Sequence, residues 1–90
     1  MPTIWGDLDR VDTDLHGPRS IQVTTSLPGG GTAIRTRILV GDQTLISRGI
    51  ERVDLSSLQK GDFVEVTYRR AQAGFMEAET IYVRSDQVFV

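Results

Sequence analysis

The chain contains no cysteine, one histidine and one lysine. The absence of cysteine excludes disulfides, thiolate zinc sites and cysteine nucleophiles. Because His16 is the only histidine, a metal centre built from several histidines is excluded as well. No apolar run approaches the ~20 residues that a membrane-spanning helix requires. The net charge of −2 argues against a protein that binds nucleic acid or anionic lipid by overall attraction.

The remaining composition is that of a small globular protein, with 39% hydrophobic and 24% charged residues in a chain of 90. No internal repeat, low-complexity tract or charge block interrupts it, so we predict a single domain over residues 1–90. The first residues lack the basic and apolar regions of a secretory signal. The chain is therefore expected to be either cytoplasmic or the trimmed mature part of an exported (periplasmic) protein.

Residues that favour β-strands dominate, because valine, isoleucine, threonine and the aromatics far outnumber alanine and glutamate. Apolar alternation predicts five strands, near residues 3–12, 20–26, 34–46, 62–70 and 76–83, with a short further strand at 88–90. The inward-facing side predicted for these strands comprises Ile4, Gly6, Leu8, Ile21, Val23, Ile34, Thr36, Ile38, Val40, Val64, Val66, Tyr68, Met76 and Ala78.

One segment between these strands has the pattern of a short helical turn. Asp54 is placed to act as its N-cap and Gly61 to end it. Leu55 and Leu58 are three residues apart and would therefore enter the core together.

The inward-facing phase slips twice, between Leu8 and Val11 and between Ala78 and Ile81. An extra residue in a strand marks a bulge, at which the strand bends toward a second set of neighbours. Such bends allow a small sheet to close on itself. We therefore predict an all-β fold, a single five-stranded OB-like closed barrel with a short helical turn between strands 3 and 4. A small β-sandwich is the alternative.

Three stretches carry a likeness to a known family: Ile4-x-Gly6-x-Leu8-x-x-Val11-Asp12, Asp54-Leu55-x-x-Leu58-x-x-Gly61-Asp62-x-Val64-Glu65-Val66, and Ala78-Glu79-Thr80-Ile81-Tyr82-Val83. Together they resemble a widespread bacterial family of small OB-like β-barrels that is catalogued only as a domain of unknown function. The resemblance implies the barrel fold and a frequent association with export signals. It implies no active site, since the family has none established. The strand that begins Gly61-Asp62 is also similar to one in single-strand-binding and initiation-factor OB proteins.

Carboxylate side chains can form two kinds of site, one that binds a cation and one that performs acid–base catalysis. Asp12-x-Asp14-x-His16-Gly17 imitates the start of a calcium loop, but Val23 stands where a bidentate glutamate is needed. The other acidic residues alternate with basic ones or fall at strand ends, which is typical of solvated surfaces. We therefore expect no enzyme, no metal site and no cofactor.

The arginines form the strongest candidate binding site. Arg35 and Arg37 would lie on the outer side of the third strand, next to Gln22 and Thr24 of the second. OB barrels bind ligands on that surface and on the loops that border it, near which Arg69 and Arg70 fall. The candidate ligand-binding residues are thus Gln22, Thr24, Arg35, Arg37, Arg69 and Arg70. Cross-strand pairing of these arginines with glutamates is the structural alternative.

A second candidate surface consists of apolar side chains that the alternation leaves outside, namely Trp5, Phe63 and Phe89. They would either cover the barrel ends or contact a partner chain. The expected function is that of a non-enzymatic OB-like interaction module that recognises a protein or polymer, or spaces domains within a larger envelope-associated chain. The alternative is a weak single-stranded nucleic-acid binder, for which the arginines qualify but a row of stacking aromatics is missing.

Overall fold

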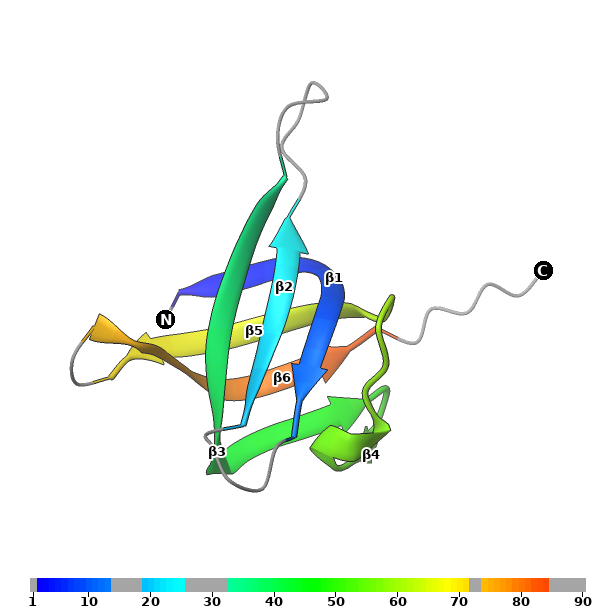
Figure 1. The fold of residues 1–90 in the computed structure, drawn as a ribbon. Coiled ribbons are helices and arrows are strands. Elements are labelled where there is room, and N and C mark those ends of the chain that lie inside the picture. The colour runs from blue at the N-terminus through cyan, green and yellow to red at the C-terminus, as the bar shows by residue number, and fades with distance from the viewer. Residues whose placement is uncertain (1, 14–18, 26–32, 72–73, 85–90) are drawn as a thin grey trace.

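The computed structural model describes residues 2–13, 19–25, 33–71 and 74–84. The strands are β1 (Thr3–Asp12), β2 (Ser20–Thr25), β3 (Ile34–Arg48), β4 (Glu51–Arg52), β5 (Phe63–Arg70) and β6 (Met76–Val83), and the 3-10 helix η1 spans Leu55–Ser57. In Figure 1, β2 and the first part of β3 cross steeply over β5 and β6, as in orthogonally packed layers. No helix in the described part of the chain is long and apolar enough to span a membrane.

The strands form a closed barrel in the order β2-β1-β5-β6-β3, and β3 pairs back with β2. β4 attaches to the end of β3 as an extra strand that the sequence did not predict. Of the described pairs, only β3–β6 is parallel. The prediction of a five-stranded closed barrel is confirmed, with η1 between its third and fourth strands.

The first predicted bend lies where β1 changes its neighbour. Residues 3–7 of β1 pair with β5, and residues 7–12 pair with β2. The register of the β1–β2 pair shifts between Leu8 and Arg10 of β1. Gly6 stands immediately before Asp7, the residue of β1 that pairs with both β5 and β2. A Cβ atom at Gly6 would overlap the carbonyl oxygen of Thr24 and lie 2.9 Å from Cγ1 of Val23. The absence of a side chain therefore lets β1 and β2 approach closely where the strand bends.

The second predicted bend is confirmed in β6. Thr67 of β5 pairs with Thr80, whereas Tyr68 pairs with Ala78, so that one extra residue of β6 separates the two pairs. On its other edge, β6 pairs with β3 through residues 40 and 45, and four residues of β3 lie between them. The side chain of Thr44 fixes this irregular segment, because its Oγ1 accepts a hydrogen bond from the N–H of Gly41 (3.1 Å) and donates one to the carbonyl of Ala78 (2.7 Å).

The predicted helical turn is η1, and it closes one end of the barrel. Leu55 and Leu58 each retain 5% exposure, as expected of residues that enter the core together. Asp54 is the N-cap residue of η1, as predicted, but its side chain makes no capping hydrogen bond. The carbonyl of Asp54 instead accepts hydrogen bonds from the N–H (2.9 Å) and Oγ (2.8 Å) of Ser57. The prediction that Gly61 ends the turn is wrong, because Leu58 is the C-cap and donates its N–H to the carbonyl of Leu55.

The turn after η1 binds this end to β1. Gly61, with φ of +99°, donates its N–H to the carbonyl of Leu8 (2.8 Å), and Leu8 donates in turn to the carbonyl of Asp62 (2.7 Å). The Asp62 side chain accepts from the guanidinium of Arg48 (3.1 Å) and from the N–H of Gln59 (3.0 Å). Gly61 and Asp62 therefore have a structural function in this barrel.

The core consists of the predicted inward-facing residues with few exceptions. Its buried members are Leu8, Ile21, Val23, Ile38, Val40, Ile46, Leu55, Leu58, Val64, Val66, Ala78, Ile81 and Val83. Ile4, Val11, Tyr68 and Met76 are half-buried against it. Ile34 was predicted on the inward side but is 49% exposed, because it begins β3 four residues before Ile38, the first buried residue of that strand. The predicted strand at 88–90, the loop at 27–31 and His16 lie outside the described residues.

Candidate binding surface

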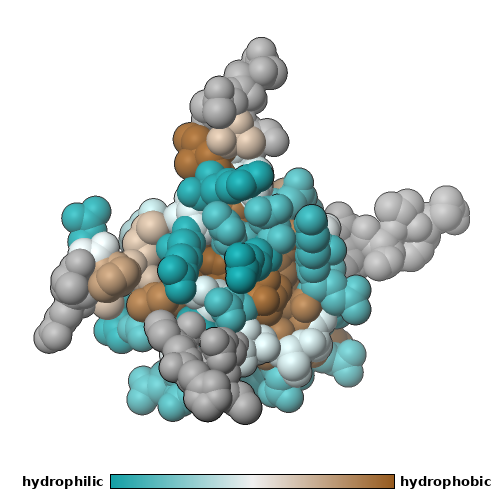
Figure 2. Space-filling model, in the orientation of Figure 1, coloured by the Kyte–Doolittle hydropathy of each residue, from teal (hydrophilic) through white to brown (hydrophobic). Residues whose placement is uncertain are grey.

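The outer surface of β2 and β3 brings together four of the six predicted binding residues. Thr24 pairs with Arg35 and Gln22 pairs with Arg37 across the two strands. Both arginines are exposed and both β2 residues are half-buried. Figure 2 shows hydrophilic side chains gathered over these strands on the side that faces the viewer. The placement follows from strand alternation, because the inward positions between them are Val23, Thr36 and Ile38.

The two arginines on β3 differ in their contacts. The Nε of Arg35 lies 3.7 Å from Oδ2 of Asp9, so this side chain extends over β2 toward β1. The Nε of Arg37 donates to Oγ of Ser20 at 3.3 Å. In the described part of the chain, Arg37 forms no ion pair. Arg37 also lines a small hollow of about 170 Å³ with Arg10, Asp12, Ser20 and Gln22.

The other two predicted residues, Arg69 and Arg70, line a groove at the start of β6. This groove has a volume of about 500 Å³ and is lined by Leu39, Arg69, Arg70, Ala71, Phe75 and Glu77. Arg69 is bound by Glu77, with 2.7 Å between Nη2 and Oε1. Arg70 forms no ion pair with any described residue. Phe75 is 58% exposed and supplies an aromatic surface beside the cations.

A row of paired residues connects the groove to the surface of β2 and β3. Ser20 pairs with Leu39, Leu39 with Glu77, and Glu77 with Arg69. All six predicted residues therefore belong to one continuous surface, which also includes Arg10, Leu39 and Phe75. We call these nine residues the arginine band. Arg10 and Leu39 were missed, although outward positions on strands β1 and β3 are recognisable from their apolar neighbours.

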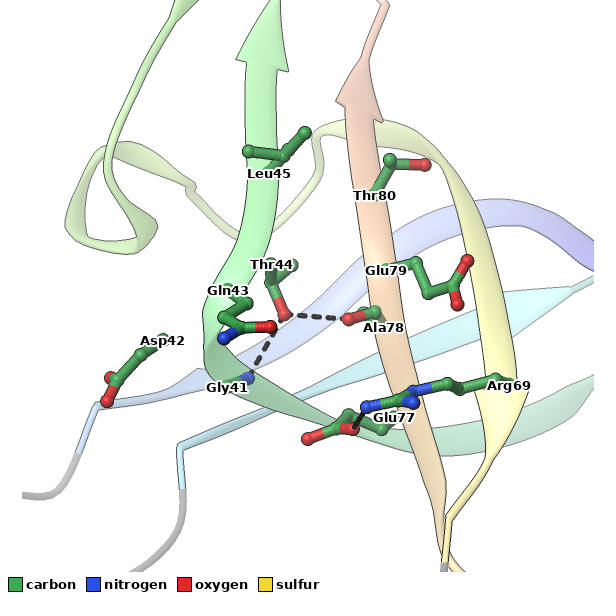
Figure 3. A pocket seen from close by; sticks show the side chains of 10 residues that line it. All are labelled: Gly41, Asp42, Gln43, Thr44, Leu45, Arg69, Glu77, Ala78, Glu79 and Thr80. Atoms are coloured by element: carbon green, nitrogen blue, oxygen red, sulfur yellow. Dashed lines mark hydrogen bonds and ion pairs between the residues drawn. The ribbon is translucent and has the colours of Figure 1, made fainter.

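A second cleft adjoins the band on the far side of the Arg69–Glu77 ion pair (Figure 3). It measures about 530 Å³ and lies between residues 41–45 of β3 and residues 77–80 of β6. A Cβ atom at Gly41 would stand 3.0 Å from Oε2 of Glu77, so glycine there leaves room for this carboxylate. Figure 3 shows Asp42 directed away from the cleft, and this residue pairs with Arg19 at 2.8 Å. The Thr44 hydroxyl is already satisfied, and the other polar side chains that line the cleft are Asp42, Gln43, Arg69, Glu77, Glu79 and Thr80.

One polar atom at the band has no hydrogen-bond partner in the structure. The Oγ1 atom of Thr24 is buried, and neither a backbone nor a side-chain group of the described residues bonds to it. Leaving a buried hydroxyl unsatisfied costs roughly 1–3 kcal/mol. Thr24 pairs with Arg35, so this hydroxyl lies beside the surface that Arg35 occupies.

The predicted partner patch is partly present. Trp5 is 58% exposed and Phe63 is 37% exposed, and both lie on the outer side of the β1–β5 pair. Tyr82, which was not predicted as part of this patch, joins them because Glu65 pairs with both Trp5 and Tyr82. The guanidinium carbon of Arg84 lies 5.6 Å from the centre of the Phe63 ring. Phe89 lies outside the described residues.

The carboxylates of the described residues form no group of three or more that could hold a metal ion. Asp12, the first residue of the sequence that imitates a calcium loop, ends β1. Asp14 and His16 lie outside the described residues.

No family model, curated protein or solved structure matches this chain. The resemblance to the bacterial family of unknown function therefore stays a prediction.

Proposed function

We propose that this chain is a non-enzymatic OB-like interaction module that binds an extended, acidic segment of a protein partner along the arginine band. The order of the barrel strands and the position of η1 support the OB-like assignment. The observation that carries the binding proposal is the continuity of the surface of β2 and β3 with the groove that contains Arg70 and Phe75.

The charges of the band favour an anionic ligand. Five arginines (Arg10, Arg35, Arg37, Arg69 and Arg70) stand there beside three carboxylates (Asp9, Asp12 and Glu77). Arg37 and Arg70 form no ion pair among the described residues, so an acidic ligand would displace no described carboxylate from them. A guanidinium binds carboxylates through two parallel hydrogen bonds, which adds geometric specificity to charge attraction.

Charge reversal tests the proposal. The double variant Arg37→Glu, Arg70→Glu breaks no ion pair in the described structure and should keep the fold. Its affinity for a fluorescein-labelled poly-glutamate peptide should fall by about tenfold or more, equivalent to ~1.4 kcal/mol. Arg52→Glu on β4 is the matched control and should bind like the unmodified chain. Equal affinities of all three proteins, or no binding of the peptide at low salt, would contradict the proposal.

A second candidate function is the binding of single-stranded nucleic acid, which Phe75 favours. This exposed ring lies in one groove with Arg70, and a base stacked on an aromatic side chain contributes ~1–3 kcal/mol. A labelled oligothymidine should then bind at low salt, lose affinity steadily as salt rises, and bind more weakly to Phe75→Ala. Absence of binding at low salt removes this candidate.

A further inference from the structure

The first part of β3 has an edge that no described strand covers. Residues 34–39 pair with β2 on one side, whereas pairing with β6 on the other side begins only at Leu39. Along residues 34–38, β3 is therefore paired on one edge. Unpaired strand edges present free backbone donors and acceptors, which make them templates for another strand.

The register identifies the backbone groups on this edge. In an antiparallel pair, the residues alternate between those that bond to the partner strand and those whose groups point away from it. The N–H of Val40 donates to the carbonyl of Arg19 at 2.9 Å, which places Ile38 and Thr36 in the bonded set as well. The N–H and C=O groups of Arg35 and Arg37 consequently point away from β2, toward the uncovered edge.

The side chains along this edge define the pattern that a pairing strand would need. Arg35 and Arg37 lie on the outer side, so acidic side chains of the added strand would face them. Ile34 and Thr36 lie on the other side, where Ile34 is 49% exposed and offers apolar contact. A strand that alternates acidic and apolar residues would therefore match both sides of the edge.

The groove at the start of β6 lies at the end of this edge. Its wall includes Leu39 and Glu77, which form the first pair between β3 and β6. The groove therefore opens where β3 and β6 separate, and a chain that leaves the edge there would meet Arg70 and Phe75. Backbone pairing and a side-chain groove are thus combined in one path.

We propose that a segment of another polypeptide with alternating acidic and apolar residues adds as a strand to residues 34–38 of β3 and continues into this groove. The inference rests on the proposed function, and it specifies the binding mode. In strand addition, main-chain hydrogen bonds provide affinity, and alternate side chains provide specificity.

Amide hydrogen exchange measured by NMR tests the mode directly. The probe is a terminally blocked peptide of alternating glutamate and valine, about six residues long, as strands usually are. In the free protein the amides of Arg35 and Arg37 should exchange faster than those of Thr36 and Ile38. Saturating peptide should slow the exchange of the Arg35 and Arg37 amides by about tenfold or more.

Two matched peptides separate backbone pairing from charge attraction. A peptide with the same sequence but N-methylated on alternate residues keeps its side chains and loses its backbone donors on one edge. It should bind more weakly and leave the exchange of both amides unchanged. A peptide with the same composition but with its glutamates in one block should also bind more weakly. If all three peptides bind with equal affinity and the amides of Arg35 and Arg37 are not protected, strand addition is wrong. The proposed function would still stand if the double variant Arg37→Glu, Arg70→Glu binds the poly-glutamate peptide more weakly than the unmodified chain.

A protein variant gives an independent test. Proline is tolerated at strand edges, and the N–H of Arg37 serves no bond to β2, so Arg37→Pro should keep the barrel and lose peptide binding. Arg37→Ala should retain the backbone pairing and bind more strongly than Arg37→Pro. Sedimentation should show a monomer; self-association that protects the same two amides would assign the edge to a second copy and overturn the proposal. The proposal would also be overturned if oligothymidine protects the amides of Arg35 and Arg37 and the alternating peptide does not.

Discussion

The two parts of β3 belong to one strand but are held in different ways. Among the described strands, residues 34–38 pair with β2 on one edge only, and their exposed side chains are arginines and Ile34. In the second part, residues 39–40 and 45–48 pair with β6, residues 47–48 also pair with β4, and the side chains of Thr44 and Arg48 form further hydrogen bonds. The second part maintains the closure of the barrel, which leaves the first part available for contacts with a partner.

The largest contrast should come from matched isoleucines. Ile46 in the second part is 6% exposed, so Ile46→Ala should lower the free energy of unfolding by about 2–5 kcal/mol. Ile34 is half exposed, and Ile34→Ala should change the free energy of unfolding by less than about 0.5 kcal/mol. Urea unfolding followed by circular dichroism measures both. Similar losses for the two variants would mean that the first part of β3 contributes to stability as much as the second.

A matched pair of arginines should give the next effect. The Nη2 atom of Arg48 donates to the carbonyl of Ser57 (3.0 Å) and to Asp62 (3.1 Å), and all three groups lie at the end of the barrel that η1 closes. Hydrogen bonds to charged groups contribute ~1.5–3 kcal/mol each to stability. Because Arg48 is partly exposed, Arg48→Ala should lower the free energy of unfolding by about 1–2 kcal/mol. The exposed Arg35 pairs loosely with Asp9, so Arg35→Ala should cost less than about 0.5 kcal/mol. Thermal unfolding in low and high salt checks the ranking, and the reverse order would contradict it.

The smallest effect distinguishes two threonines, and its sign is the test. The hydroxyl of Thr44 makes two hydrogen bonds, so Thr44→Val leaves the N–H of Gly41 and the carbonyl of Ala78 without this partner. A loss of about 1 kcal/mol is expected. The buried hydroxyl of Thr24 has no partner among the described residues, so Thr24→Val should leave stability unchanged or raise it slightly. Destabilisation by Thr24→Val would show that this hydroxyl is hydrogen-bonded in solution.

The barrel could be predicted because its bends leave a trace in the sequence. The slips at Leu8–Val11 and Ala78–Ile81 are spacing errors in an otherwise regular pattern, and both coincide with register shifts in the structure. The outward positions of Arg35 and Arg37 follow from the same alternation. Tyr82 was equally predictable, since it stands between the inward residues Ile81 and Val83.

The uncovered edge of β3 could not be predicted in this way. Alternation tells which side of a sheet a residue faces, but an edge is defined by the neighbouring strands and their register. The position at which β6 meets β3 depends on residues 41–44 of β3, which are four residues opposite Glu79 alone. The bond between Arg48 and Asp62 escaped prediction for a similar reason, because two segments 14 residues apart meet only after the barrel closes.

The parallel contact between β3 and β6 also has a consequence for how the molecule forms. Neighbours such as β2 and β3, or β5 and β6, are short hairpins that can form early, because little chain entropy is lost when nearby residues meet. Joining β3 to β6 and β1 to β5 brings together distant parts of the chain, and such contacts form slowly. We expect the last and slowest step of folding to be the formation of the β3–β6 and β1–β5 pairs. Until β6 has been synthesised, a nascent chain would therefore expose the edges of β3 and β5 that later pair with it.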